Sequence, residues 1–148
     1  MQLHMKTWAK VLLTLATLGI IAATAVYFFV YNKPHTNFER AKPDFTISAE
    51  NLYKAFIYDH VAAEKEYNAR VIQITGILND LEFTDDRVFA IFAFGDGMFG
   101  PEGIRCTLLD NHNSALSDGD IGKDVTIKGF CSGFTGTDVI LEHCSVLK

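Results

Sequence analysis

Several residue types are scarce in this 148-residue chain. It holds three prolines and eleven glycines, which excludes collagen-like chains and Pro/Gly-rich low-complexity chains. Its three cysteines are too few for a disulfide-rich miniature fold, and none precedes Cys106, so we expect no lipid-modified cysteine near the start. Because 49% of the residues are hydrophobic, a disordered chain is excluded as well. The length allows one ordinary domain with a small appendage.

Charge is absent from residues 11–31, where the sequence is VLLTLATLGIIAATAVYFFVY. A helix of this length spans roughly 31 Å, which matches the ~30 Å hydrocarbon core of a bilayer. Trp8 precedes the run, and Tyr27 and Tyr31 lie at its other end, as aromatic residues do at membrane interfaces. We therefore predict a transmembrane helix over residues 11–31, preceded by a short cytoplasmic tail over residues 1–10.

A cleaved signal peptide is the competing interpretation of this segment. Lys6 and Lys10 would form its basic region, and residues 23–25 (Ala-Thr-Ala) offer a small-residue cleavage pattern. Cleavage there would leave the apolar sequence VYFFVY at the new N-terminus, and the run exceeds the usual apolar region of about 7–15 residues. We favour an uncleaved anchor. A short basic tail favours a cytoplasmic N-terminus, which predicts a single-pass protein of the inner (cytoplasmic) membrane with an exported, periplasmic C-terminal domain.

Acidic residues outnumber basic ones in the remainder of the chain. The formal charge of the whole sequence is −5, from 13 basic and 18 acidic residues. Lys6 and Lys10 are the only charged residues before position 33, so 11 basic and 18 acidic residues follow the predicted span, a formal charge of −7. Residues 32–45 are mostly polar and contain two prolines, which indicates a linker. We expect the folded domain to occupy residues 46–148.

A helical pattern begins at Ser48. A serine at the N-cap followed by Glu50 in the first turn favours a helix start. Apolar residues then recur at helical spacing and form a core-facing stripe: Leu52, Phe56, Ala63 and Tyr67. We predict one amphipathic helix over about residues 49–66.

Five segments after this helix have the alternation or apolar character of β-strands. They are residues 70–78, 87–94, 104–109, 123–131 and 138–147. Gly76, inside the first segment, predicts a bulge or sharp bend of the kind that small barrels require. Residues 132–137 predict a hairpin between the last two segments. Five short strands with a long connection between the third and fourth predict a small β-barrel.

Several short sequences after Ser48 carry a family resemblance. They are the helix end with Ala62, Ala63 and Tyr67, the strand VIQITG (71–76), Cys106, DIGKDVTIKGFCSG (120–133) and VILEHCSV (139–146). Through them the segment from Ser48 to Lys148 resembles the tRNA_anti-like family of bacterial membrane- or lipid-anchored OB-fold proteins. The resemblance implies a mainly β fold, a five-stranded OB-fold (Greek-key) barrel preceded by one amphipathic α-helix, here with a plain apolar span at the N-terminus. The family name by itself implies no RNA ligand.

The sequence motifs do not predict catalysis. GDGMFG (95–100) matches the G-x-G-x-x-G dinucleotide pattern, but Pro101 and a strand follow it instead of a helix, which favours a hairpin loop. Asp118, Asp120 and Asp124 lack the remaining ligands of a calcium loop and indicate a solvated turn. No nucleophile has a supporting base in a recognised arrangement. We predict a protein that is not an enzyme and uses neither metal nor cofactor.

The cysteines allow two interpretations. Cys106 and Cys131 share strand faces with apolar residues, so we expect them in the barrel interior. Cys131 and Cys144 lie on strands joined by one hairpin and could form a disulfide in an oxidising compartment, if a bulge or a longer loop aligns them. Buried free thiols are the alternative.

OB barrels bind oligonucleotides on the face of their second and third strands. The candidate ligand-binding residues are the aromatic residues of the strands, Phe89, Phe92, Phe94, Phe130 and Phe134. From Asp80 to Glu102 six acidic residues accompany one basic residue, Arg87, and such a surface is poor at binding phosphates. We therefore expect an envelope protein, a peptide or a small polar ligand as partner rather than a nucleic acid. The alternatives are an oligonucleotide-binding module, or a face covered by the helix at 49–66.

Overall fold

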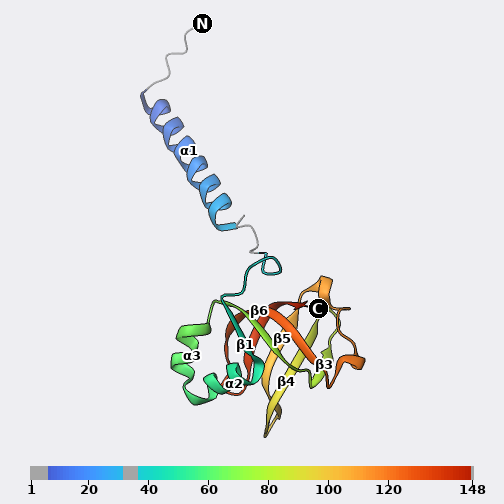
Figure 1. The fold of residues 1–148 in the computed structure, drawn as a ribbon. Helices are drawn as coiled ribbons and strands as arrows, with labels where there is room; N and C mark the ends of the chain where they lie inside the picture. Colours follow the sequence, from blue (N-terminus) through green and yellow to red (C-terminus); the bar gives the residue numbers. More distant parts are fainter. Residues whose placement is uncertain (1–6, 32–36, 148) are drawn as a thin grey trace. The chain divides into compact units, whose positions relative to one another are not determined.

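The computed structural model describes residues 7–31 and 37–147, which belong to two separate compact units (Figure 1). The first unit is α1 (Thr7–Val26), which continues as a π-helical turn, η1 (Tyr27–Tyr31). An 18-residue window within Thr7–Phe29 has a mean hydropathy of 2.2, and the helix is long and apolar enough to cross a membrane. The Thr14 hydroxyl donates to the Val11 carbonyl at 2.8 Å, so this polar group is satisfied inside the helix.

The second unit is a seven-stranded sheet that curls into a barrel (Figure 1). Its strands are β1 (Phe45–Ser48), β2 (Val71–Ile77), β3 (Asp80–Phe83), β4 (Val88–Gly97), β5 (Gly100–Leu108), β6 (Asp124–Phe134) and β7 (Val139–Leu147). Their order is β1-β2-β6-β7-β5-β4-β3, with β1–β2 and β5–β7 parallel and the other pairs antiparallel. Because β3 directly follows β2 in the chain, Leu78 and Asn79 connect β2, the neighbour of one edge strand, with β3, the edge strand at the other end of the sheet. The Asn79 N–H donates to the Ile91 carbonyl of β4 at 2.9 Å, which helps to close the barrel.

The predicted number of five strands is wrong. The segment predicted as the first strand, residues 70–78, forms β2, which pairs with β6, and the chain then bends into β3, which is not among the predicted strands and pairs with β4. In addition, β1 pairs with β2 and is not among the predicted strands either, since Phe45 belongs to the predicted linker and residues 46–48 lie just before the predicted helix. Both β1 and β3 have four residues, and β3 is acidic, so neither offers the long apolar alternation by which a strand is recognised. All five predicted segments are strands, namely β2, β4, β5, β6 and β7, and the hairpin between β6 and β7 is confirmed.

The single predicted helix is two helices, α2 (Ala49–Tyr58) and α3 (His60–Tyr67). The N-cap is confirmed, because the Ser48 hydroxyl accepts a hydrogen bond from the Asn51 N–H at 3.2 Å. Asp59 separates the helices, and its carboxylate accepts the Ala62 N–H at 3.1 Å. An aspartate that caps a new helix in this way competes with continuation of the old one. The predicted apolar stripe nevertheless holds on both helices, since its four residues are buried: Leu52, Phe56, Ala63 and Tyr67.

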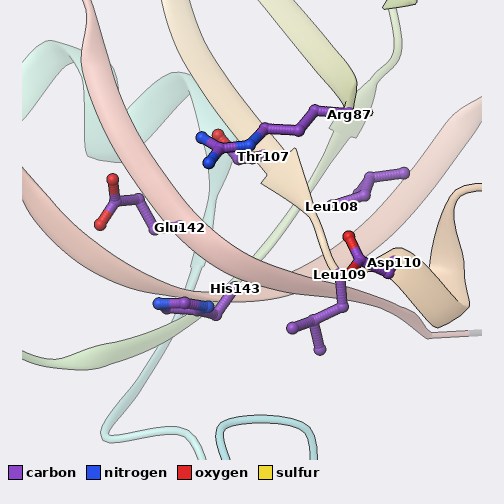
Figure 2. Close-up of a pocket in the computed structure, with 7 residues that line it drawn as sticks. All are labelled: Arg87, Thr107, Leu108, Leu109, Asp110, Glu142 and His143. Atoms are coloured by element: carbon purple, nitrogen blue, oxygen red, sulfur yellow. The ribbon is translucent and has the colours of Figure 1, made fainter. Parts of the chain in front are cut away.

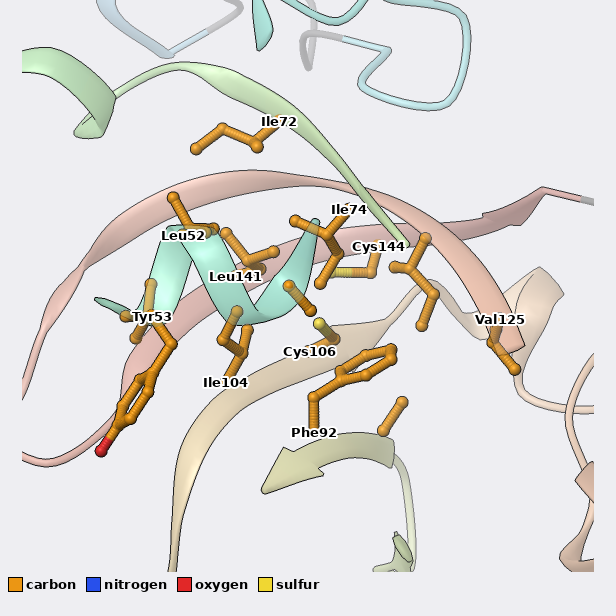
Figure 3. Packing of buried hydrophobic residues seen from close by; sticks show 14 of the residues in the cluster. Leu52, Tyr53, Ile72, Ile74, Phe92, Ile104, Cys106, Val125, Leu141 and Cys144 are labelled. Atoms are coloured by element: carbon orange, nitrogen blue, oxygen red, sulfur yellow. The ribbon is translucent and has the colours of Figure 1, made fainter. Parts of the chain in front are cut away.

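The hydrophobic core fills the barrel and is covered at one end by α2 (Figure 3). Leu52 of α2 and Phe92 of β4 are fully buried, together with residues from β2, β5 and β7. The interior position predicted for Cys106 and Cys131 is confirmed, because both have 0% exposure. A Cβ at Gly103 would overlap the Phe92 carbonyl oxygen, so this glycine allows β4 and β5 to approach closely.

The connection between β5 and β6 contains two short 3₁₀ turns, η2 (Asp110–His112) and η3 (Asp118–Asp120). Asp120 accepts the Ser117 N–H at 2.9 Å and completes a capping box. Backbone and side-chain hydrogen bonds from Ser117 lower the pKa of Asp120. This agrees with the solvated turn that the sequence predicts here.

Phe92→Ala should destabilise the protein by about 3–5 kcal/mol, because it leaves a cavity in a filled barrel interior. Phe99→Ala is the matched control, since Phe99 is 99% exposed, and its effect should stay within about 0.5 kcal/mol. Urea unfolding of the full chain in detergent, followed by near-UV circular dichroism, measures both changes. Equal effects would contradict the assignment of Phe92 to the core.

Candidate ligand-binding face

The five aromatic residues predicted to bind ligand do not share a surface. Phe92 is a core residue, because Val88, Ala90 and Phe92 alternate toward the barrel interior. The prediction of Phe92 as a ligand-binding residue is therefore wrong. Phe89 lies on the opposite, outer face of β4 and is half-buried. It alone of the five remains on the outer face of β4 and β5.

The other three pack against segments that precede the barrel. Phe94 is 38% exposed and stacks on Tyr53 of α2, with ring centroids 5.5 Å apart. Phe134 packs on Phe56 of the same helix, also at 5.5 Å. One alternative from the sequence is that the helix at 49–66 covers the aromatic face. It applies to Phe94 and Phe134, because α2 partly covers both. Phe130 lies on the outer side of β6 and has its own covering, described below.

Arg105 lies at the centre of the outer face of β3, β4 and β5. Its Nη1 is 3.2 Å from Glu82 Oε2, and its Nε is 3.3 Å from Asp138 Oδ2. The other Asp138 oxygen accepts the Gly103 N–H at 2.9 Å. We call Glu82, Phe89, Arg105, Thr107 and Asp138 the strand face. Side chains alternate along a strand, so the interior position expected for Cys106 could have shown that its neighbour Arg105 points outward. The pairing of Arg105 with Asp138 follows only from the parallel register of β5 and β7.

The glycine-rich segment forms the end of the β4–β5 hairpin, as predicted. Gly97 pairs with Gly100, and Met98 and Phe99 at the tip are 92% and 99% exposed. Gly100 has a φ of +123°, a conformation that favours glycine in the turn. A Cβ at Gly97 would overlap the Glu102 side chain, so this glycine leaves room for Glu102. The motif therefore builds a hairpin and no helix N-terminus for phosphates.

Residues 37–44 pack against the outside of the barrel, and we call them the strap. The Lys128 ammonium of β6 donates to the carbonyls of Glu39 and Ala41 at 2.7 and 2.8 Å. These bonds explain how a lysine can be only 8% exposed. Phe38 of the strap covers Phe130, with ring centroids 5.0 Å apart. Sequence patterns gave no sign of this docking, because its partners lie more than 80 positions apart in the chain.

Two histidines also hold the strap. The Phe38 ring stacks on His143 at 5.0 Å and 10°. Glu39 Oε1 lies 3.0 Å from His112 Nε2, while His112 Nδ1 accepts the Val146 N–H at 3.3 Å. The hydrogen bond from His112 lowers the pKa of Glu39. This contact therefore stabilises the fold above the ordinary carboxyl range and is lost as the pH falls through the lowered pKa of Glu39.

A β-bulge at His143 changes which residues of β7 face inward. Its φ is +52°, and the register with β6 moves from Phe130–Glu142 to Lys128–Ser145. Beside the bulge is a pocket of about 300 Å³ (Figure 2). Seven residues line it: Arg87, Thr107, Leu108, Leu109, Asp110, Glu142 and His143. We call it the bulge pocket.

All three cysteines are free and buried in the structure, so of the two interpretations that of buried free thiols holds and the possible Cys131–Cys144 disulfide is not formed. Cys131 lies opposite Leu141, and its thiol is 3.6 Å from Asn68 Oδ1, whereas the bulge turns Cys144 inward beside Cys106 (Figure 3). Burial raises the pKa of Cys131 to about 11 and also raises that of Cys144. Both thiols are therefore protonated at neutral pH and poor nucleophiles. Within residues 7–31 and 37–147, no group of three His, Cys, Asp or Glu residues is placed to hold a metal ion.

Lys128→Met should release the strap while preserving most of the aliphatic packing of the lysine. Removal of two charge-assisted hydrogen bonds predicts amide exchange at Ala41 that is faster by roughly tenfold or more. Hydrogen–deuterium exchange of the full chain measures it. Lys123→Met, at an exposed lysine paired only with Asp120, is the control and should leave the Ala41 exchange rate unchanged. Equal rates in both variants would mean that Lys128 does not hold the strap.

Comparison with known proteins identifies the family. No curated protein matches the sequence. A solved structure from Klebsiella pneumoniae, described as a "putative nucleic acid-binding lipoprotein", is 20% identical, with 78% of this chain and 100% of that chain covered and a TM-score of 0.48. The yeast Stn1 and Ten1 structure is 12% identical, with 74% of this chain and 65% of that chain covered and a TM-score of 0.39. The tRNA_anti-like family model matches residues 1–146, almost the full length. The chain is therefore a member of the tRNA_anti-like family.

Proposed function

We propose that this protein is a membrane-anchored, non-catalytic OB-fold module whose strand face binds a protein or peptide that carries lysine or arginine residues. The observation that supports this most directly is the pairing of Arg105 with two carboxylates, Glu82 and Asp138. The one basic residue of the strand face is thus already neutralised.

The charges around Arg105 favour a cationic partner. Binding of nucleic acid draws much of its affinity from cations that neutralise phosphates, and most OB sites for single strands add stacking aromatic residues. Here Arg105 is already paired with Glu82 and Asp138. The neighbouring segments are rich in carboxylates: Asp80, Asp85, Asp86, Asp96 and Glu102. Phe89 offers one apolar contact beside them. A partner with basic side chains next to an apolar residue complements both features.

The second candidate function is binding of a single-stranded oligonucleotide. It is favoured by the position of Phe89 and Arg105 on the strands that OB barrels use for this ligand. Arg87, in the turn before β4, forms no ion pair with any described residue and is available for phosphate. The two candidates differ in the sign of the charge that they require on the ligand.

For the anchor, we propose that α1 is retained uncleaved in the inner membrane, with the barrel exported. The apolar run continues past the small-residue pattern at 23–25 through Phe28 and Phe29, which a cleaved signal would leave exposed. A periplasm-active reporter fused after Lys148 should then be active, and intact-mass analysis of the membrane fraction should recover residue 1 or 2 as the N-terminus. A reporter active only in the cytoplasm would contradict export. A mature N-terminus near position 26 would contradict the anchor.

Fluorescence anisotropy with the full chain in detergent distinguishes the two ligands. We expect a labelled decapeptide of alternating Lys and Phe to bind, its Glu-for-Lys counterpart not to bind, and a twelve-nucleotide dT or rU strand not to bind. Glu82→Lys should weaken binding of the Lys peptide by roughly tenfold, and Phe89→Ala should weaken it as well. Glu66→Lys, on the exposed side of α3, is the charge-matched control.

Two outcomes would contradict the peptide proposal. If Glu66→Lys and Glu82→Lys weaken the Lys peptide equally, the binding is nonspecific attraction to an acidic protein. If the oligonucleotide binds with a steep dependence on salt and loses affinity in Arg105→Gln, the second candidate function is the correct one.

A further inference from the structure

The bulge pocket is lined by ionisable side chains of both signs that come from three places in the chain. Arg87 belongs to the turn before β4, Asp110 to η2, and Glu142 and His143 to the bulge of β7. Figure 2 shows these side chains around the pocket, which Thr107 of β5 also lines. The strand face ends at this pocket, because Thr107 lies opposite Phe89 in the β4–β5 register.

The backbone at the pocket is held in an unusual conformation. His143 is one of only two non-glycine residues with positive φ in the part of the chain that the structure describes. Such conformations and bulges concentrate at binding sites, where they direct side chains that regular alternation would place elsewhere. Below the bulge, the Leu109 N–H donates to the Cys144 carbonyl at 2.9 Å and fixes the end of β5. The pocket is therefore built by a defined backbone and is not a gap between loops.

Opposite charges around the pocket do not neutralise each other. The side chains of Arg87, Asp110 and Glu142 form neither ion pairs nor hydrogen bonds with residues of the described ranges, although all three line one pocket. On the neighbouring strand face, by contrast, Arg105 contacts both of its carboxylates at 3.2–3.3 Å. The pocket thus keeps a guanidinium and two carboxylates apart, with room for a ligand between them.

We propose that the bulge pocket binds a small zwitterion that carries one carboxylate and one ammonium group, of the size of a free amino acid or a dipeptide. The guanidinium of Arg87 would bind the ligand carboxylate through two parallel hydrogen bonds. Glu142 and Asp110 would receive the ammonium group, and Leu109 offers an apolar contact. The inference goes beyond the proposed function, because the pocket can hold this ligand whether or not the strand face binds a peptide.

Ligands of a single charge suit the pocket less well. An anion alone would meet two carboxylates for one guanidinium, and a cation alone would leave Arg87 beside a second positive charge. A volume of about 300 Å³ is at the small end of the range for ligand sites, which suits an amino acid or a dipeptide. The pattern of charges, more than the volume, specifies the ligand class.

Three dipeptides that differ only at their ends test the proposal. The probes are Ala-Ala, N-acetyl-Ala-Ala, which keeps only the carboxylate, and Ala-Ala-amide, which keeps only the ammonium group. NMR titration of the full chain in detergent micelles should show saturable shifts of the Thr107, Leu109 and Glu142 amides with Ala-Ala. Each blocked dipeptide should bind at least roughly tenfold more weakly, because it loses one charged contact.

Single substitutions show which pocket residue binds the carboxylate of the ligand and which binds its ammonium group. Arg87→Gln should lower the affinity for Ala-Ala to that for Ala-Ala-amide, and Glu142→Gln should lower it to that for N-acetyl-Ala-Ala. Arg70→Gln and Glu66→Gln, at exposed residues away from the pocket, should leave the affinity unchanged.

Three results would overturn the proposal. They are the absence of saturable shifts at the pocket amides with Ala-Ala, equal binding of all three dipeptides, or unchanged Ala-Ala affinity in both pocket variants. Because Arg87 and Glu142 are exposed, their variants should fold like the wild type, which the amide spectrum itself verifies.

Discussion

Closure of the barrel through Leu78 and Asn79 is the constraint on which the rest of the second unit depends. The chain leaves β2, paired with β6, and within two residues begins β3, paired with β4. Leu78 is fully buried at this bend, and the Asn79 side chain accepts the Ala93 N–H at 2.8 Å. The closed sheet gives Phe92 an interior to fill, and α2 covers one end of that interior. Every outer surface discussed above is positioned by this closure.

The bulge at His143 links three features that are distant in sequence. The bulge changes which residues of β7 point inward, so Cys144 is buried near Cys106. It also turns the His143 ring outward, where Phe38 of the strap stacks on it. It also opens the pocket next to Glu142. One backbone irregularity therefore turns Cys144 inward, anchors part of the strap and shapes a candidate binding pocket.

Electrostatics divides the outer surface into regions of different chemistry. On the strand face, Arg105 is paired and the surplus charge is negative. In the bulge pocket, charges of both signs stay unpaired around a small volume. Under the strap, Lys128 is satisfied by main-chain carbonyls and Glu39 by His112, so this region is closed to ligands while the strap is bound. The same fold thus has two candidate surfaces for ligands and one surface that is already covered by its own chain.

The sequence by itself determined the features that depend on local periodicity and composition. These include the apolar helix, the capped start of α2 with its buried stripe, five of the strands and the hairpin built by the glycines at 95–100. Only the tertiary structure decided which of the two faces of β4 is buried, because strand alternation separates Phe89 from Phe92 without saying which one meets the core. It likewise decided the Arg105 pairing, the docking of the strap on Lys128 and the bulge at His143. Each of these joins residues far apart in the chain, and their approach follows from strand order and register, which local patterns do not encode.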